Sequence, residues 1–205
     1  AKLQCNRTRT NGAGCRRVNR AQHVQQRRFA ATRGSPQNDK LTQNAIRFAK
    51  KNQVSVTEFA KSPDRGFWSD LFKDKDDPMT AGKKVLFLTH SKGNFIRPCP
   101  STKLKLCCNL HNIDIGSNCP FDCTYCILNS YLNFLPITMY TNLDQLAQQI
   151  DAQYADQFLR VSPGNLTDSL GLDHILNYST EVMRIAERFP NVLIEFKTKS
   201  DFVDN

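Results

Sequence analysis

The sequence predicts an α/β fold with a parallel sheet over the C-terminal half of the chain. Three observations support this prediction. Helical and strand-like apolar patterns alternate at the separations of βαβ units. Hydrophobic residues make up 40% of the 205 residues, enough for one ordinary core or at most two small ones. No run of about 18 apolar residues occurs, so we expect no membrane-spanning helix and no membrane partner.

The first part of the chain is strongly basic. Residues 1–33 hold nine Lys and Arg and no Asp or Glu, whereas residues 34–205 carry 19 basic and 19 acidic side chains. Because residues 1–40 also lack apolar periodicity, we predict a disordered basic arm there. A solvated tail, a nucleic-acid-contacting arm and an organelle transit peptide all agree with this composition.

Residues 41–102 are predicted to form a small N-terminal α/β region. Apolar residues at helical spacing indicate a helix over residues 41–52. Residues 62–83 are rich in Pro, Gly and charged side chains, which is typical of turns. A short apolar run at residues 85–88 then indicates a buried strand.

From residue 103 onward the patterns alternate between strand and helix. The expected elements are strands over 103–115, 158–161 and 192–196, and helices over 143–154 and 172–188.

Three cysteines stand close together in the loop that follows the first of these strands. Cys119, Cys123 and Cys126 have C-x3-C-x2-C spacing, and three thiolates so spaced can surround one small metal centre. Zinc sites usually have four ligands in two separated pairs, whereas a [4Fe–4S] cluster held by three cysteines keeps one iron open. An iron–sulfur cluster is therefore favoured, with zinc or inert thiols as alternatives.

Other cysteines lie nearby. Cys99, Cys107 and Cys108 could supply a fourth zinc ligand or be small buried hydrophobic residues. Cys107 and Cys108 are adjacent, so in a strand their side chains would point to opposite faces and could not easily share one metal.

The cysteine spacing and its βα context resemble the radical S-adenosylmethionine (SAM) superfamily, and further stretches resemble its spore photoproduct lyase family. The stretches are Leu88-Thr89-His90-Ser91-Lys92-Gly93, Cys107-Cys108, Asn118-Cys119 to Cys126-Ile127-Leu128, Leu166-Thr167-Asp168-Ser169-Leu170-Gly171-Leu172-Asp173-His174, Lys197-Thr198-Lys199 and Val203-Asp204. The resemblance covers about residues 84–205.

This resemblance implies a fold and an activity. The fold would be a partial (β/α) radical-SAM barrel, about half of a six-unit TIM-like barrel. The cofactors would be a [4Fe–4S] cluster and SAM, which together generate a 5′-deoxyadenosyl radical. In the family that radical repairs a thymine photoproduct, so the implied partners are damaged DNA and an electron donor such as a flavodoxin or ferredoxin. An oxygen-sensitive cluster further implies a cytoplasmic location.

The resemblance also assigns residues. Cys119, Cys123 and Cys126 would be the cluster ligands, and Tyr125 would relay a hydrogen atom beside SAM. Thr167 and Lys199 would lie near SAM, each just past the end of a predicted strand.

Two positions depart from the family. The hydrogen-donating cysteine of the family corresponds to Asn165, which cannot donate a hydrogen atom to a carbon radical. A family tyrosine just after the last cluster ligand corresponds to Ile127. The sequence therefore favours a lyase-like relative over a photoproduct repair enzyme in the strict sense. A nucleic-acid-binding protein with a structural metal and an inactive cluster-binding fragment remain alternatives.

The expected organisation has three parts. They are a basic arm at 1–40, an N-terminal α/β region at 41–102, and the first half of a radical SAM barrel with the cluster loop at 103–205. Because only about three barrel strands are predicted, we expect a fragment of a longer protein.

Overall fold

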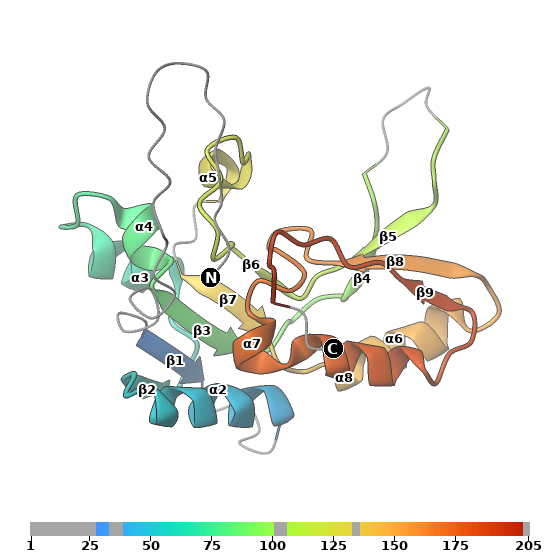
Figure 1. Ribbon diagram of the computed structural model, residues 1–205, viewed down its shortest axis with the longest axis horizontal. Helices are drawn as coiled ribbons and strands as arrows, with labels where there is room; N and C mark the ends of the chain where they lie inside the picture. Colours follow the sequence, from blue (N-terminus) through green and yellow to red (C-terminus); the bar gives the residue numbers. More distant parts are fainter. Residues whose placement is uncertain (1–27, 33–38, 101–105, 133–135, 203–205) are drawn as a thin grey trace.

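The computed structural model describes residues 28–32, 39–100, 106–132 and 136–202. Its strands form two sheets, with helices α2, α6 and α8 along the lower side in the view of Figure 1. The hairpin β4–β5 and the cysteine loop with α5 extend from the opposite side. Helices packed with sheets of mixed parallel and antiparallel strands confirm the predicted α/β class. The half barrel remains a prediction.

The first sheet has five strands in the order β2-β1-β3-β7-β6. Pairing is parallel between β1 and β2, between β1 and β3, and between β3 and β7, while β6 runs antiparallel to β7. The strands span Arg28–Thr32 (β1), Val56–Phe59 (β2), Val85–Thr89 (β3), Gly116–Ser117 (β6) and Ile137–Tyr140 (β7).

The second sheet has four strands in the order β4-β5-β8-β9. The pair β4–β5 is antiparallel, and β8 pairs in parallel with both β5 and β9. The strands span Ile96–Pro98 (β4), Leu110–Ile113 (β5), Leu159–Pro163 (β8) and Val192–Ile194 (β9).

The short segment between β5 and β6 joins the two sheets. The carbonyl of Ile115 accepts the N–H of Tyr140 at 2.9 Å, at the end of β7. The carbonyl of Ile113 accepts the N–H of Gly164 at 3.2 Å, just after β8. The ends of β7 and β8 are therefore held on the same short piece of chain.

Seven helices lie in the described part of the chain. They are α2 (Lys40–Lys51), α3 (Arg65–Phe72), α4 (Pro78–Gly82), α5 (Leu128–Tyr131), α6 (Asp144–Tyr154), α7 (Asp173–Leu176) and α8 (Tyr178–Ala186). None of them has the length and apolar character needed to cross a bilayer.

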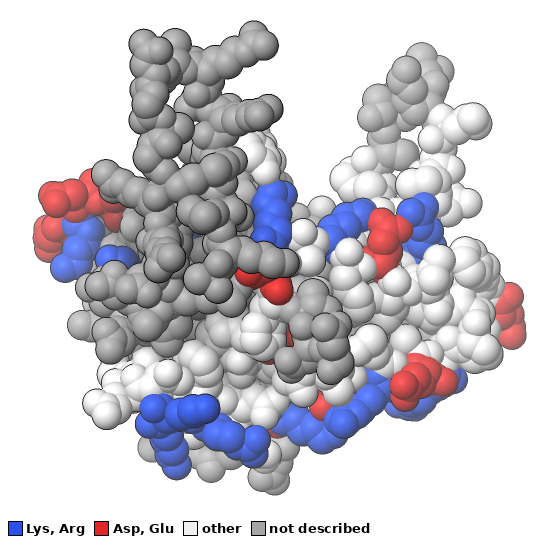
Figure 2. All heavy atoms as spheres, viewed as in Figure 1, with Lys and Arg blue, Asp and Glu red and all other residues white. Residues whose placement is uncertain are grey.

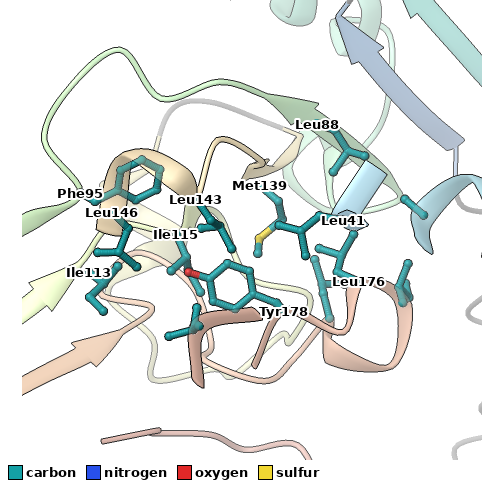
Figure 3. Packing of buried hydrophobic residues seen from close by; sticks show 14 of the residues in the cluster. Leu41, Leu88, Phe95, Ile113, Ile115, Met139, Leu143, Leu146, Leu176 and Tyr178 are labelled. Carbon is teal, nitrogen blue, oxygen red and sulfur yellow. The ribbon is translucent and has the colours of Figure 1, made fainter. Parts of the chain in front are cut away.

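Strand β3 is buried on both faces, which explains its continuous apolar run. Leu86 and Leu88 belong to the main core, which also takes in α2, α6, α7 and α8 (Figure 3). Val85 and Phe87 point to the other face, where they pack with Trp68 of α3. A strand covered on both faces needs hydrophobic residues at every position.

Several predicted elements are confirmed. Helices α2 and α6 and strands β3, β8 and β9 lie where the patterns place them, within a few residues at each end. Of the strand expected over 103–115, the structure forms β5 at Leu110–Ile113, and residues 101–105 lie outside the described part.

The expected disorder of the basic arm is wrong for Arg28–Thr32, which form β1 between β2 and β3. Phe29 and Ala30 are 3% and 4% exposed, so this five-residue strand is stabilised by burial between two neighbours rather than by any local pattern. The rest of the arm, 1–27 and 33–38, lies outside the described residues.

The turn-rich segment 62–83 contains two helices, α3 and α4. Each begins at an aspartate whose side chain accepts a backbone N–H: Asp64 from Phe67 at 2.8 Å and Asp77 from Thr80 at 3.1 Å. The buried side chain of Trp68 then fixes α3 against β3. The two aspartate caps and the burial of Trp68 therefore stabilise helices in a segment whose composition predicts turns.

The helix predicted over 172–188 is interrupted. Asn177 adopts a left-handed conformation (φ 52°) and separates α7 from α8. The carboxylate of Asp173 accepts the N–H of Ser179 at 2.7 Å and its hydroxyl at 2.6 Å, which stabilises the start of α8.

Candidate functional site

The cysteine loop begins where β6 ends. Asn118 has φ 65°, a conformation that Asn tolerates better than most residues, and it is 2% exposed. Its Oδ1 accepts the N–H of Cys119 at 2.8 Å. This buried turn directs the chain out of the sheet and into the loop.

The second half of the loop is a compact turn. The N–H of Cys126 donates to the carbonyl of Cys123 at 3.0 Å, and the N–H of Asn129 donates to the carbonyl of Cys126 at 3.2 Å. The Asn129 side chain donates to the Cys123 carbonyl as well, at 3.2 Å. Cys123 and Cys126 therefore lie on one hydrogen-bonded turn that leads into α5.

The loop after β8 packs directly against the first half of the cysteine loop. A Cβ added to Gly171 would lie 2.8 Å from Cγ of Pro120 and 3.2 Å from Cε2 of Phe121. Only glycine allows so close an approach. The two loops are therefore in contact beside Cys119.

Asp168 joins the loop after β8 to the segment after β9. Its carboxylate accepts the N–H of Leu170 at 3.0 Å, the hydroxyl of Thr198 at 2.6 Å and the N–H of Lys199 at 2.7 Å. Three hydrogen bonds to one carboxylate fix the backbone at Lys199.

Lys199 extends toward the cysteine loop. Its Nζ lies 5.7 Å from the centroid of the Tyr125 ring, which is within the range of a cation–π contact. Electrostatic attraction to the Tyr125 oxygen and a side-chain hydrogen bond to it raise the pKa of Lys199, and attraction to Cys123 and Asp168 adds to the effect.

Burial raises the pKa of the Cys119 thiol, and the Asp168 carboxylate raises it further. The N–H groups of Phe121 and Asp168 act in the opposite direction, because they donate toward the sulfur. Without a metal, Cys119 is therefore a neutral thiol that already has hydrogen-bond donors for a thiolate.

The donor set matches an iron–sulfur cluster in its chemistry. All six cysteines in the described part of the chain are free thiols, and three of them lie on this one loop. Soft thiolates in this number suit an iron–sulfur centre. In the described residues, however, no group of three or more His, Cys, Asp or Glu side chains is arranged to hold a metal ion. The ligand types fit the cluster, but the sulfur atoms are not gathered in this structure.

The structure brings several of the predicted site residues into one neighbourhood. Tyr125 and Lys199 are in contact, and Asp168 links Lys199 to the loop that contains Thr167. Thr167 is buried at 7% exposure. The cluster, SAM and hydrogen-relay roles of these residues remain predictions.

The two positions that depart from the lyase pattern are both exposed. Ile127 is 73% exposed and Asn165 is on the surface of the loop after β8. Neither side chain is part of the core.

Lys83, whose side chain is bonded to the cysteine loop, is not predicted from the sequence. It stands beside Lys84 in a charged segment, and nothing in the sequence separates the two lysines. The link that Asp168 makes could not be predicted either, since Thr198 and Lys199 are about 30 residues away from it.

No protein-family model matches the chain, and no curated protein matches it either. Solved structures of spore photoproduct lyase do match. A double mutant with bound S-adenosylmethionine and dinucleoside spore photoproduct gives a TM-score of 0.63 at 15% identity, covering 82% of this chain and 48% of that one. A single mutant gives 0.65 at 16% identity, covering 84% and 50%.

A third structure, spore photoproduct lyase complexed with dinucleoside spore photoproduct, gives a TM-score of 0.63 at 14% identity, covering 82% of this chain and 48% of the other. The chain spans about half the length of the solved structures it matches. Its fold is thus similar to that of spore photoproduct lyase, a radical SAM enzyme, as the sequence resemblance predicts.

Proposed function

We propose that this chain is a radical SAM enzyme of the spore photoproduct lyase type. The observation that carries the proposal is the convergence of three segments: the cysteine loop, the loop after β8 and the segment after β9. In α/β folds the functional groups gather at the carboxyl ends of parallel strands, and both β8 and β9 end here. A fold similar to a radical SAM lyase supports the same activity.

Cys119, Cys123 and Cys126 would hold a [4Fe–4S] cluster through their thiolates, and SAM would bind at the open iron. When bound, these cofactors supply a 5′-deoxyadenosyl radical. The compact turn at Cys123–Asn129 and the donors at Cys119 would hold the ligands in place as the loop closes around the cluster.

Lys199 would bind the carboxylate of SAM through its ammonium group, because Asp168 fixes its backbone at the edge of the cysteine loop. Tyr125, 78% exposed beside Lys199, would relay the hydrogen atom. Thr167 would contribute from the loop after β8. The β8–β9 half of the structure would then be part of a (β/α) barrel.

For the substrate we propose a thymine photoproduct in DNA or a chemically related lesion. The matching structures include complexes with dinucleoside spore photoproduct. Since Asn165 and Ile127 cannot return a hydrogen atom, that step would follow a route different from the one in the family. Such a lesion has to leave the base stack before it reaches the site.

DNA binding is also supported by the charge distribution. Lys and Arg gather along the lower edge of the view in Figure 2, over α2 and α8. The exposed basic residues on and just beyond these helices are Lys40, Arg47, Lys50, Lys51, Arg184 and Arg188. Such side chains bind phosphates without sequence preference. A flavodoxin or ferredoxin would supply the electron, in the reducing environment of the cytoplasm.

The test is anaerobic reconstitution with iron and sulfide. We expect about four irons per chain, release of 5′-deoxyadenosine when SAM and a reductant are added, and loss of both in Cys123→Ala. Cys108→Ala is the matched control, because Cys108 is an exposed thiol outside the loop. One zinc per chain without SAM cleavage would instead indicate a nucleic-acid-binding protein with a structural metal. A cluster without 5′-deoxyadenosine would indicate an inactive cluster-binding chain.

A further inference from the structure

Lys83 is a buried lysine next to an exposed one. It follows α4 directly and is 9% exposed, whereas Lys84 is exposed. Lysine is seldom buried unless its charge is bonded, since removing an ammonium group from water is costly. The burial of Lys83 therefore requires partners, and these lie about 40 residues further along the chain.

All three partners of the Lys83 ammonium belong to the cysteine loop and its exit. Nζ donates to the carbonyl of Phe121 at 3.0 Å, to Oδ1 of Asp122 at 3.1 Å and to Oδ1 of Asn129 at 3.1 Å. An ammonium group has three N–H donors, so these three bonds satisfy it completely.

The three bonds hold both halves of the loop. Phe121 and Asp122 lie between Cys119 and Cys123, and Asn129 lies beyond Cys126. Because the Asn129 amide also donates to the carbonyl of Cys123 at 3.2 Å, it connects Lys83 to the backbone of that cysteine. One side chain is thus bonded to the loop on both sides of Cys123 and Cys126, starting two residues after Cys119.

The base of this contact is rigid. Only Lys84 separates Lys83 from β3, whose residues are buried on both faces, and the Lys83 N–H donates to the carbonyl of Met79 in α4 at 3.1 Å. A group that positions a site works best from a rigid element.

The charge of Lys83 is only weakly neutralised. The carboxylate that it contacts in the described part of the chain, Asp122, has a side chain that is 72% exposed, so water screens the pair. A fixed cation close to the loop favours negative charge on the groups that the loop holds.

We propose that Lys83 is the positioning residue of the cysteine loop, and that its ammonium charge favours the reduced form of the cluster. This inference rests on the proposed function for its second part only. Without the cluster, Lys83 keeps the loop ordered. With the cluster, its positive charge raises the reduction potential, because the reduced cluster carries one more negative charge.

The test compares Lys83→Met with Lys84→Met, the same change at the neighbouring exposed position. In the metal-free chain, hydrogen exchange of the Cys126 and Asn129 amides is expected to be about tenfold faster in Lys83→Met and unchanged in Lys84→Met, since one hydrogen bond to a charged group is worth at least about a power of ten. Lys83→Arg, which keeps the charge, is expected to restore at least part of the protection.

In the reconstituted chain, a redox titration followed by electron paramagnetic resonance is expected to give a lower midpoint potential for Lys83→Met than for Lys84→Met. Exchange rates within about twofold of the wild type overturn the positioning role. Equal midpoint potentials in Lys83→Met and Lys84→Met overturn the proposed effect of the Lys83 charge on the cluster. If the wild type binds no cluster, the proposed function fails, while the exchange result still decides the positioning role.

Asn129→Ala provides a second test in case Lys83→Met does not fold. Asn129 is partly exposed, and its replacement leaves Lys83 and its bonds to Phe121 and Asp122 in place. We expect faster exchange at Cys126 without loss of the fold, and unchanged exchange there contradicts the proposed connection.

Discussion

Replacing Asp168 by Asn tests how the segment after β9 is held at the site. The change keeps the size of the side chain but leaves one acceptor oxygen in place of two. That oxygen still accepts from Leu170 and Thr198, and the new NH2 group then faces the N–H of Lys199, where the two heavy atoms are 2.7 Å apart. Two donors cannot bond, so the Lys199 amide loses its partner.

The size of the effect follows from these bonds. A hydrogen bond to a charged acceptor contributes about 1.5–3 kcal/mol, and the lower end applies because the Lys199 bond is exposed. Weakening of the Thr198 bond, now to a neutral oxygen, adds about 0.5 kcal/mol. Local opening of this segment is therefore expected to become about 2 kcal/mol easier, or about thirtyfold more frequent.

Native-state hydrogen exchange of the Lys199 amide measures this opening. Asp151→Asn is the control, since Asp151 is an exposed residue of α6. A change of less than about threefold in Asp168→Asn would show that the carboxylate does not hold the segment, and the proposed placement of Lys199 would lose its structural basis.

Two further changes probe the loop contact and a surface ion pair. Gly171→Ala places a Cβ 2.8 Å from Cγ of Pro120 and should lower the free energy of unfolding, measured by urea titration, by about 1–3 kcal/mol. Gly93→Ala is the control, because its Cβ meets only the flexible end of Arg97. Equal free energies of unfolding for the two variants would contradict the close approach of the loops. The hydrogen bond from Arg160 lowers the pKa of Glu195, so the stabilisation it supplies is present above the ordinary pKa of 4.5 and disappears as the pH falls through the lowered value. Thermal melts of Glu195→Gln should therefore lose less stability than the wild type on acidification below pH 4.5, and parallel curves would show that the pair contributes nothing.

The elements that the sequence predicted well are those with a strong local pattern. Helix α2 has a buried face at helical spacing, and β3 is a continuous apolar run bounded by polar residues. Strands β1 and β7 were missed because neither has the continuous run of large apolar residues that marks β3, and their hydrogen bonds come from partners distant in the sequence.

The cysteine loop shows the same division. Its three thiols and their spacing were visible in the sequence, as were Tyr125, Thr167 and Lys199 through the resemblance. The contact of Lys199 with Tyr125 and the bonds of Asp168 to Thr198 and Lys199 were not visible, since they join segments that meet only in the folded chain.

By itself, the sequence determined the types of chemical group and the local structure: soft sulfur donors in one loop, a basic N-terminal part and alternating strands and helices. Only the tertiary structure decided which of two adjacent lysines lies beneath that loop and which faces water. The physical reason is that burial depends on the distant carbonyl, carboxylate and amide oxygens that complete the ammonium group's hydrogen bonds, and no local pattern contains them.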